Sequence, residues 1–521
     1  MSTPLRSRTL LAAALTSCAL LVPTEGHAFC GFYVGGADQS LYANATMVTL
    51  MRDGNRTVLS MQNDYQGPPE GFAMVVPVPV VLHEEDVRTL PRDLFARIDT
   101  LAAPRLVEYW EHDPCAPQAE YMNSMPGSVM TECATSDGGG SNEDLQVRIE
   151  AQFAVGEYDI VILSAGDSTG LETWLHREHY NIPEGAGASL RPYVEAGTKF
   201  FVARVDPTRV TFENGHAILS PLRFHYDSPD FWLPVRLGLL SSAGQQDLIV
   251  HILARNQRFE VANYANVTIP TNLRVVEAVR DEFGGFYEYV FRETIAHNPR
   301  TVVTEYAWDA QSCDPCPGPT LTPEDITTLG ADVIADHAPY GFTLTRLHYR
   351  YSPEDLNEDL VFRTASPIEG GRGIPDAQGV MSQGASISQY GGNNFQGRYV
   401  ILHPFEGEVT CESPQRGRWG GPPGSDSGSP PSTQGSSNAA MSGAITSAPM
   451  QGEAMLQGPI NWQQGQGTQP STSLGGAVPL APRGGGCASC SVSDVRGDSM
   501  AVLGILGVLG TFALRRRRKR A

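Results

Sequence analysis

Lysine is almost absent from this 521-residue chain, which contains it only at Lys199 and Lys519. Arginine supplies most of the 37 basic residues, and 57 acidic residues outnumber them, so the formal net charge is −20. Binding of nucleic acid or of anionic lipid needs a positive protein surface. The shortage of positive charge therefore argues against both as partners of the folded part, which also lacks a P-loop and a dinucleotide-binding glycine pattern.

The N-terminus has the pattern of a secretory signal peptide. Two arginines precede the apolar, uncharged stretch 10–22, which is too short to span a bilayer comfortably. A proline ends this stretch, and small residues follow at the two positions that a signal peptidase reads. We expect residues 1–28 to be a signal peptide that is cleaved between Ala28 and Phe29. A lipoprotein-like block leaves a second interpretation open, in which Cys18 is the lipidated first residue.

The C-terminus carries a second membrane signal. Residues 500–514 are apolar, and six consecutive basic residues follow at 515–520. Such a cationic block stays on the cytoplasmic side, because moving its charges through lipid costs several kcal/mol each. The apolar segment is shorter than the usual span of ~20 residues, which suits a tail that is processed. An ordinary membrane helix at the end of the chain predicts nearly the same location.

The tail also resembles a known sorting signal. Three glycines, Cys487, a short polar spacer, the apolar segment and the arginine cluster together are similar to the myxobacterial C-terminal sorting signal. The resemblance implies that residues 487–521 are a sorting tail, and that a sorting protease acts on it. It also implies that a cysteine is the processing and lipid-attachment point, a position that Cys487 and Cys490 both fit.

Six cysteines lie between the two termini: Cys30, Cys115, Cys133, Cys313, Cys316 and Cys411. An even set in an exported chain most simply forms three disulfides, and sequence does not choose among the pairings. We expect Cys115 to pair with Cys133, because the two are close in sequence and joined by a loop-like stretch. Cys30 and Cys411 bracket the folded region and are expected to tie its ends together.

Composition divides the chain into a folded part and a stalk. Residues 29–411 have a globular composition, whereas residues 412–486 are rich in Gly, Ser, Pro and Gln. A segment of that kind buries too little apolar surface to offset its ordering entropy, so we expect a disordered stalk. The folded part exceeds one typical core. We therefore predict an α+β N-terminal subdomain at 29–207 and a β-rich C-terminal subdomain at 208–411.

Local patterns predict an α+β fold with mainly antiparallel sheets and a few helices. Asp53 and Gly54 lie between two β-rich runs, which predicts a hairpin. Residues 91–111 have a helical period, and 323–329 form a second, short helix signal. The segment 279–295 is ambiguous, because two adjacent glycines argue against a single helix.

Six blocks of the folded part are distinctive when taken together: residues 29–34, 59–69, 72–79, 103–110, 182–185 and 246–248. In these blocks the folded part resembles the bacterial family called domain of unknown function 2330. The resemblance extends over about residues 29–411. It implies an exported bacterial protein and supplies no activity, because the family has none assigned.

The sharpest chemical motif is Cys313-Asp-Pro-Cys316. Such a pair exchanges thiols when its first thiolate is stabilised, usually by a helix N-terminus. Prolines after the motif delay any helix until about residue 323, so the pattern favours a structural disulfide.

Three weaker motifs have plainer explanations. His176 and His179 are spaced i, i+3 instead of the i, i+4 of a zinc-binding helix, and no third ligand is apparent, so no metal site is predicted. The acidic segment 137–144 offers loop oxygens to calcium but lacks the alternation of an EF-hand. The block 166–168 resembles the surroundings of a lipase-type serine, without an evident histidine base.

These patterns together predict an exported, membrane-anchored ectodomain of the cell envelope with a structural or interaction role, no catalytic activity and no cofactor. Its expected partners are the membrane, the sorting protease, and proteins or polysaccharides of the envelope. One alternative is an envelope thiol-disulfide redox protein that uses Cys313 and Cys316. A second alternative is a calcium-dependent binding module.

Overall fold

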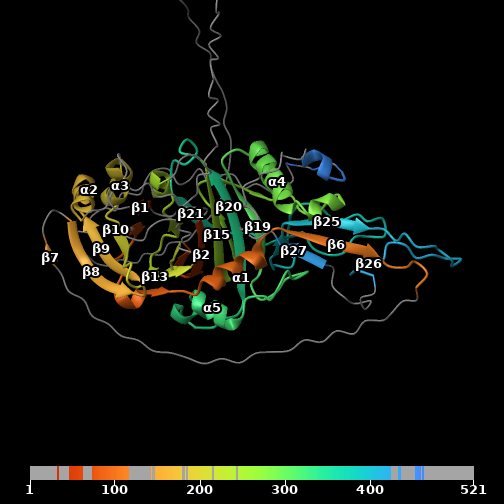
Figure 1. The fold of residues 1–521 in the computed structure, drawn as a ribbon, viewed down its shortest axis with the longest axis horizontal. Coiled ribbons are helices and arrows are strands. Elements are labelled where there is room, and N and C mark those ends of the chain that lie inside the picture. Colours follow the sequence, from red (N-terminus) through yellow and green to blue (C-terminus); the bar gives the residue numbers. More distant parts are fainter. Residues whose placement is uncertain are drawn as a thin grey trace, which may run out of the picture. The chain divides into compact units, whose positions relative to one another are not determined.

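A computed structural model describes the following residues of the chain: 32–34, 46–62, 73–116, 142–143, 147–178, 182, 186–213, 216–241, 245–423, 432–435, 452–458, 460 and 462. Strands dominate over helices in this part, and most neighbouring strands are antiparallel (Figure 1). The predicted class of mainly antiparallel sheets with a few helices is therefore confirmed. All of these residues belong to one unit of the chain, Met1–Gly476.

An 11-stranded sheet forms the centre of the fold. In spatial order it contains β23 (Ser386–Ile387), β22 (Ile368–Gly370), β24 (Asn394–Gln396), β19 (Thr301–Asp309), β20 (Phe342–Tyr351), β15 (Gln246–Arg255), β2 (Thr46–Asp53), β3 (Arg56–Gln62), β13 (Leu222–Asp227) and β5 (Val87–Thr89), with β17 (Ala265–Thr268) beside β19. β2 runs parallel to β15, although the two strands lie on opposite sides of the predicted boundary at 207/208. The predicted subdomains 29–207 and 208–411 therefore share one sheet, because β15 completes the hydrogen bonding along an edge of β2.

The hairpin of β2 and β3 confirms the prediction from Asp53 and Gly54. The strands pair from Met47 opposite Gln62 to Asp53 opposite Arg56. Gly54 has a φ of 53°, a left-handed conformation that glycine adopts without the steric penalty of a Cβ atom. The sequence signal was sufficient here because the turn chemistry is local.

A six-stranded sheet packs against one face of the central sheet. Its order is β1 (Phe32–Val34), β4 (Ala73–Val78), β10 (Lys199–Val205), β9 (Tyr158–Ala165), β8 (Val147–Val155) and β7 (Asn142–Glu143). Side chains of both sheets share one buried apolar cluster, in which the Phe201 and Phe224 ring centroids are 5.1 Å apart. The largest core of the protein therefore lies between the two sheets.

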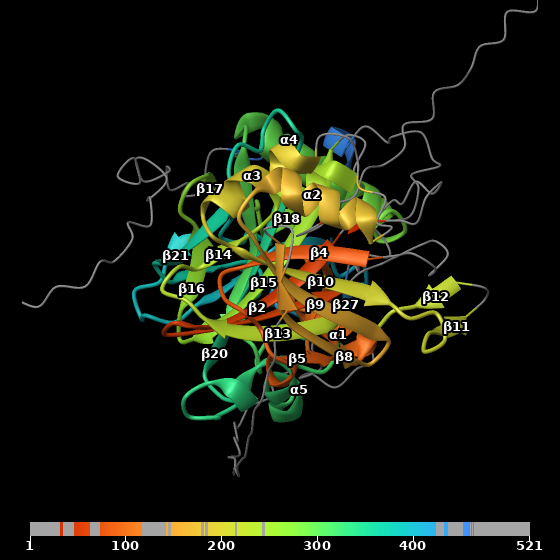
Figure 2. The same ribbon diagram turned by 90° about the vertical axis from the view of Figure 1, so that its left-hand side faces the viewer.

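Helices cover the two outer faces. α2 (Ser168–Arg177) and α3 (Ala186–Glu195) bury Leu171 and Leu190 on the six-stranded sheet. α1 (Arg92–Ala102) and α5 (Pro323–Leu329) bury Ile98 and Ile326 on the far face of the central sheet. Figure 2 shows α2 and α3 above the strands and α5 below them. The layers are therefore helix, sheet, sheet and helix.

A five-stranded sheet extends the fold at the other end. Its strands are β18 (Leu273–Arg274), β25 (Arg398–His403), β6 (Arg105–Glu111) and β26 (Trp419–Gly420), with β27 (Ser432–Gly435) also beside β6. β18, β25 and β6 are parallel. α4 (Phe283–His297) buries Phe286 and Phe291 in the apolar cluster that includes Tyr399 of β25.

Smaller elements complete the fold. A three-stranded sheet contains β14 (Trp232–Leu233), β21 (Leu360–Ala365) and β16 (Arg258–Val261), and β11 (Thr211–Glu213) pairs with β12 (His216–Ile218). The short 3-10 helices are η1 (Glu84–Asp86), η2 (Arg236–Ser241), η3 (Glu277–Arg280), η4 (Ala331–Val333) and η5 (Gly452–Met455).

Two helix predictions need correction. The predicted helix over 91–111 ends at Ala102, and β6 follows almost at once. Ala103 has an extended backbone, because the ring of Pro104 disfavours the helical conformation of the residue before it. In contrast, the ambiguous segment 279–295 is largely helical: its two glycines fall in the first turn of α4, and a Cβ on Gly285 meets no atom within 4 Å.

Parts of the predicted stalk at 412–486 contact the folded part. β26 and β27 both pair with β6. Met455 is only 3% exposed and lies in the cluster beneath α4, and the Trp462 ring stacks on His297 with centroids 5.5 Å apart. Composition did not reveal these contacts, because a few apolar residues in a polar segment are enough to make them.

Among the helices that the structure describes, none is long and apolar enough to cross a membrane. The predicted signal peptide at 1–28, including the cleavage site at Ala28 and Phe29, lies outside the described residues. The same holds for the tail at 487–521 with Cys487 and Cys490, so these features stay predictions.

Candidate functional site

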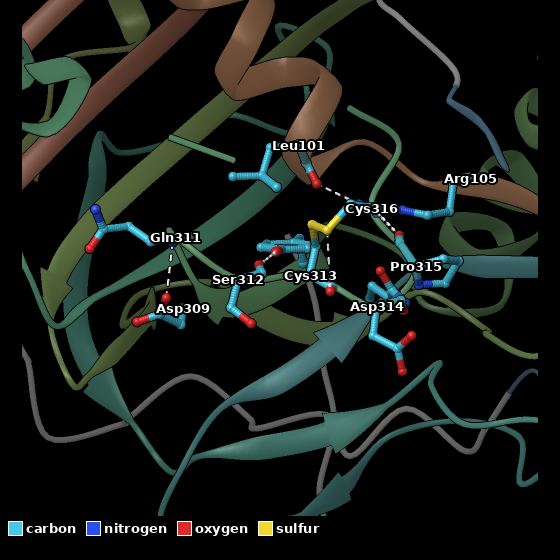
Figure 3. Close-up of a disulfide and its surroundings, with 11 residues drawn as sticks. Leu101, Arg105, Asp309, Gln311, Ser312, Cys313, Asp314, Pro315 and Cys316 are labelled. Atoms are coloured by element: carbon cyan, nitrogen blue, oxygen red, sulfur yellow. Dashed lines mark hydrogen bonds between the residues drawn. A yellow bond between two sulfur atoms is a disulfide. The ribbon is translucent and has the colours of Figure 1, made fainter. Parts of the chain in front are cut away.

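The Cys313–Cys316 turn follows the end of β19 (Figure 3). The two cysteines form a disulfide, with their Cα atoms 5.0 Å apart. The turn is held from within the fold, because Gln311 donates its backbone N–H to Asp309 Oδ1 at 2.9 Å and Tyr306 donates its hydroxyl to the Ser312 carbonyl at 3.3 Å. The motif is therefore part of an ordered turn.

A buried arginine supports this turn. The Arg105 side chain donates from Nη1 to the Pro315 carbonyl at 2.9 Å and also to the Leu101 carbonyl (Figure 3). Burial lowers the pKa of Arg105 to about 10, so the guanidinium stays charged at neutral pH. Cys313 is half-buried against the α1 and α5 cluster, whereas Cys316 is exposed. One sulfur is thus open to solvent, and a fixed positive charge lies against the carbonyl between the two cysteines.

The turn lacks the feature that usually makes such a cysteine pair reactive. α5 begins only at Pro323, and Thr322 caps it by accepting from the Asp325 backbone N–H at 3.1 Å. The helix N-terminus is therefore remote in sequence from Cys316, and one of its free N–H groups is already satisfied. A thiolate at Cys313 gains no stabilisation from being the first residue of a helix, which is the usual cause of a low thiol pKa.

The second disulfide joins Cys115 to Cys411 across a sequence separation of 296. It corrects both expected pairings, Cys115 with Cys133 and Cys30 with Cys411. The cause is the parallel pairing of β6 and β25, which brings the segments after both strands to the same edge of the sheet. Cys30 and Cys133 lie outside the described residues, so their participation in a disulfide stays a prediction.

Buried charged groups form a chain across the face of the central sheet that α1 and α4 cover. Arg346 of β20 contacts Asp99 of α1 and donates from Nε to Glu305 Oε2 of β19 at 2.6 Å. Glu305 Oε1 accepts from the Tyr287 hydroxyl of α4 and lies 2.7 Å from His348 Nδ1. The side chains of Arg346, Glu305 and Asp99 are 1%, 0% and 4% exposed.

The chain continues from His348 through Asp247 of β15 and Arg350 of β20 to Glu288 of α4, the residue next to Tyr287. His348 Nε2 is 3.0 Å from Asp247 Oδ1, and Arg350 donates to Asp247 at 2.8 Å and to Glu288 at 2.6 Å. Charged groups therefore alternate in sign from α1 to α4. Such a chain ties both helices to the sheet, because each buried charge has an opposite partner.

The pKa values of this chain follow from burial and from those partners. Burial alone would raise the pKa of Glu305, but His348 and Arg346 lower it to about 2. Burial alone would lower the pKa of His348, but Glu305 and Asp247 raise it. Burial, and then the nearby Arg346, lower the pKa of His251. Shifted pKa values often mark catalytic sites, but these groups are closed to solvent, which favours a structural role.

Sequence analysis missed this chain. The signal that could have revealed it is the alternation of Arg346, His348 and Arg350 inside a strand that otherwise has the composition of a buried one. Charges at i, i+2 and i+4 lie on one face of a strand and therefore need partners on the elements that cover it.

The other motifs from the sequence do not assemble into a site. His176 is exposed at the end of α2, and His179 lies outside the described residues. The acidic segment 137–144 is described only at 142–143, as β7, so its calcium role stays a prediction. Within the described ranges, no three His, Cys, Asp or Glu side chains are grouped so that they could hold a metal ion.

The turn between β9 and α2 contains a serine motif that is longer than the sequence analysis recognised. Residues 166–170 have the complete Gly-x-Ser-x-Gly spacing. Asp167 is the N-cap of α2 and accepts from the Gly170 backbone N–H at 2.8 Å, and Ser168 is the buried first residue of the helix. A nucleophilic serine of this motif occupies a strained turn, and Ser168 is not among the described residues with a positive φ. The segment therefore acts as a helix cap.

Comparison with known proteins places the folded part in a family. No curated protein and no solved structure matches the chain. A family model matches residues 24–363, which include both Cys115 and the Cys313–Cys316 turn but end before Cys411. The resemblance inferred from sequence is thus confirmed, with an earlier end than the expected residue 411. The chain belongs to the DUF2330 family, described as uncharacterized protein conserved in bacteria.

Proposed function

We propose that the chain is an exported ectodomain, anchored to a membrane by its C-terminal tail, that has a structural or interaction role at the cell envelope and catalyses no reaction. The observation that carries the proposal is the Cys115–Cys411 disulfide. Disulfides of this kind persist in oxidising compartments outside the cytosol. The sequence supports the same location, because residues 1–28 resemble a signal peptide and residues 487–521 resemble a sorting tail.

The position of this disulfide suits an anchored protein. Gln415 and Arg418 bond to the segment 112–114 through their backbones, so the chain beyond Cys411 stays against β6. Cys411 lies between the tail and β25, which ends at His403. If the chain is pulled or unfolds from the tail, the disulfide therefore stops the disruption before it reaches β25. The covalent link therefore protects the pairing of β25 with β6 from being pulled open.

The absence of catalysis is supported by the location of the charged groups. At the centre of the charged chain, Glu305 and His348 have shifted pKa values and are enclosed between the sheet and its helices. The accessible Cys316 does not start a helix, because α5 begins only at Pro323. Its proposed partners, beyond the membrane and the sorting protease, are proteins or polysaccharides of the envelope.

Fractionation of the native cell tests this proposal. We expect the protein in the envelope fraction, beginning at Phe29 and lacking the basic residues 515–520 if the tail is processed. N-terminal sequencing and intact-mass measurement of the purified protein give both ends. A variant with Ala28→Arg removes the small residue that the signal peptidase reads and should accumulate with its N-terminus uncleaved. Cytosolic protein with both termini intact would overturn the proposal.

A second candidate function is thiol-disulfide exchange at Cys313 and Cys316. The observation that favours it is the exposed Cys316 beside the charged Arg105, because a nearby cation stabilises a thiolate. The reduction potential of this disulfide decides between the two roles. A potential near those of thiol-disulfide exchange proteins, shifted by Arg105→Gln, supports exchange. A potential below about −300 mV supports a structural bond.

A further inference from the structure

A small cavity lies where the three-stranded sheet meets the end of the central sheet. It has a volume of about 170 Å³. The lining side chains come from β16, β17, β21, β22, β23 and the residues next to them: Arg258, Glu260, Thr268, Thr364, Ala365, Ser366, Ile368, Ala385, Ser386 and Ile387. A cavity of about 150 Å³ is large enough for a benzene-sized molecule, so this one has room for a ligand of similar size.

The floor of the cavity is charged and buried, and its rim is polar and exposed. Arg258, Glu260 and Thr268 are 7%, 4% and 8% exposed. Thr364 and Ser366, by contrast, are exposed at the rim. Burying a guanidinium costs free energy unless an anion compensates its charge. A cavity next to the buried Arg258 is therefore unexpected, because a compensating group would normally be packed there.

The charges around Arg258 do not cancel. Its Nε donates to the Ser366 carbonyl at 2.5 Å, and Nη2 reaches Glu260 Oε2 only at 3.5 Å, the outer limit of a hydrogen bond. Glu260 is held more closely by Arg363, whose Nε and Nη2 lie 2.9 and 2.8 Å from Oε1. Two guanidinium groups thus share one carboxylate, and the cluster has one positive charge in excess.

A second group at the cavity also has unused bonding capacity. The Thr268 hydroxyl is buried and has no hydrogen-bond partner among the described residues. Buried hydroxyl groups are usually satisfied, and an exception needs an explanation. A ligand or a water molecule in the cavity is the simplest way to supply the missing partner.

We propose that this cavity binds a short aliphatic carboxylate, either as a free acid or as the C-terminal residue of a peptide. The excess charge of the cluster matches the single charge of a carboxylate, whereas the second charge of a phosphate would face the buried Glu260. Rim hydroxyls are suited to a hydroxyl or amide group of the ligand. Ile368 and Ala385 provide an apolar wall for its short side chain. The inference does not depend on the compartment in which the protein acts.

Calorimetric titration of the full chain in detergent tests this site. The probes are lactate, the tripeptide Gly-Gly-Ala, its C-terminal amide, and inorganic phosphate. We expect saturable binding of lactate or of the free-acid tripeptide and much weaker binding of the amide and of phosphate. Preference for lactate identifies a free acid, and preference for the tripeptide identifies a peptide terminus.

Variants assign the binding to this cavity. Arg258→Gln should weaken binding by roughly tenfold or more, because it removes a charge-assisted hydrogen bond. Ala385→Leu fills the space without changing charge and should weaken binding similarly, so it remains decisive if the Arg258 variant fails to fold. Arg56→Gln is the matched control, because it removes a guanidinium from an ion pair with Asp227 away from the cavity. Wild-type affinity in a folded Ala385→Leu variant, tighter binding of phosphate, or no binding of either carboxylate would overturn the proposal.

Discussion

The two disulfides should differ strongly in their contribution to stability. Cys115 and Cys411 close a loop with a sequence separation of 296, whereas Cys313 and Cys316 are separated by 3. A crosslink restricts the unfolded chain, and the entropic gain grows with the logarithm of loop length. The loop-closure relation gives about 5.7 kcal/mol for the long loop and about 2 kcal/mol for the short one. Removal of native disulfides typically costs about 2–5 kcal/mol, so we expect the long-loop variant to reach the upper end of that range.

Equilibrium unfolding in urea measures this difference. The variants are Cys115→Ser with Cys411→Ser, and Cys313→Ser with Cys316→Ser, so that no free thiol of either pair remains. We expect the free energy of unfolding to fall by about 4–5 kcal/mol in the first and by about 2 kcal/mol or less in the second. Treatment of the wild type with a strong dithiol should lower the free energy of unfolding by at least the sum of both losses.

Equal losses of unfolding free energy in the two variants would contradict the expected dependence of the stabilisation on loop length. A larger loss in the Cys313 and Cys316 variant would do so as well, and would indicate that the short turn is held mainly by its disulfide and not by Arg105. Arg105→Met separates these contributions, because it removes the hydrogen bond to the Pro315 carbonyl and leaves both sulfurs in place.

Four further predictions concern individual residues of the fold. Glu305→Gln should lower the free energy of unfolding by about 3–5 kcal/mol, because it leaves buried positive charges without their partner. The pKa of Glu305 is about 2, below its ordinary value of 4.5, so its stabilising effect is present above pH 4.5 and is lost as the pH falls toward 2. The pKa of His348 is raised above its ordinary value of 6.5, so its stabilising effect is complete below pH 6.5 and is lost as the pH rises through the folded-state pKa. Urea unfolding across this pH range checks both signs. Gly330→Ala should destabilise the protein by about 1–3 kcal/mol, because φ is 145° and a Cβ would lie 2.8 Å from a Val58 methyl group. Gly54→Ala is the control in the same thermal unfolding assay and should cost less, because a Cβ there meets no atom within 4 Å. Asp167→Ala should cost about 1 kcal/mol as a lost helix cap, and Ser168→Ala should not alter hydrolysis of a small ester substrate.

Local features of the fold were predictable from sequence. The hairpin at Asp53 and Gly54 and the short helix Pro323–Leu329 both match the structure. Their signals, a turn glycine and a capped proline start, lie within the elements themselves. The helix predicted for 91–111 was too long, because its apolar period continues into β6, where both faces of the strand are buried. Periodicity alone does not separate a buried strand from a buried helix.

Features that join distant segments were not predictable. Cys115 meets Cys411 because β6 and β25 are parallel neighbours, and nothing near either cysteine reveals that pairing. The carboxylate cavity likewise draws Arg258 and Thr268 together with residues near position 385. Each of these residues, taken alone, has the appearance of an ordinary polar residue in a strand.

The redox state of Cys115 and Cys411 in the native cell is the sharpest test of whether the folded part is exported. Intact cells are treated with a membrane-permeant alkylating reagent, and the cysteine peptides are then identified by mass spectrometry before and after reduction. We expect both cysteines to stay unmodified until a reductant is added, and to be recovered as one crosslinked peptide pair from the envelope fraction. Alkylation of both cysteines without reductant, in a chain recovered from the cytosol, would contradict this expectation.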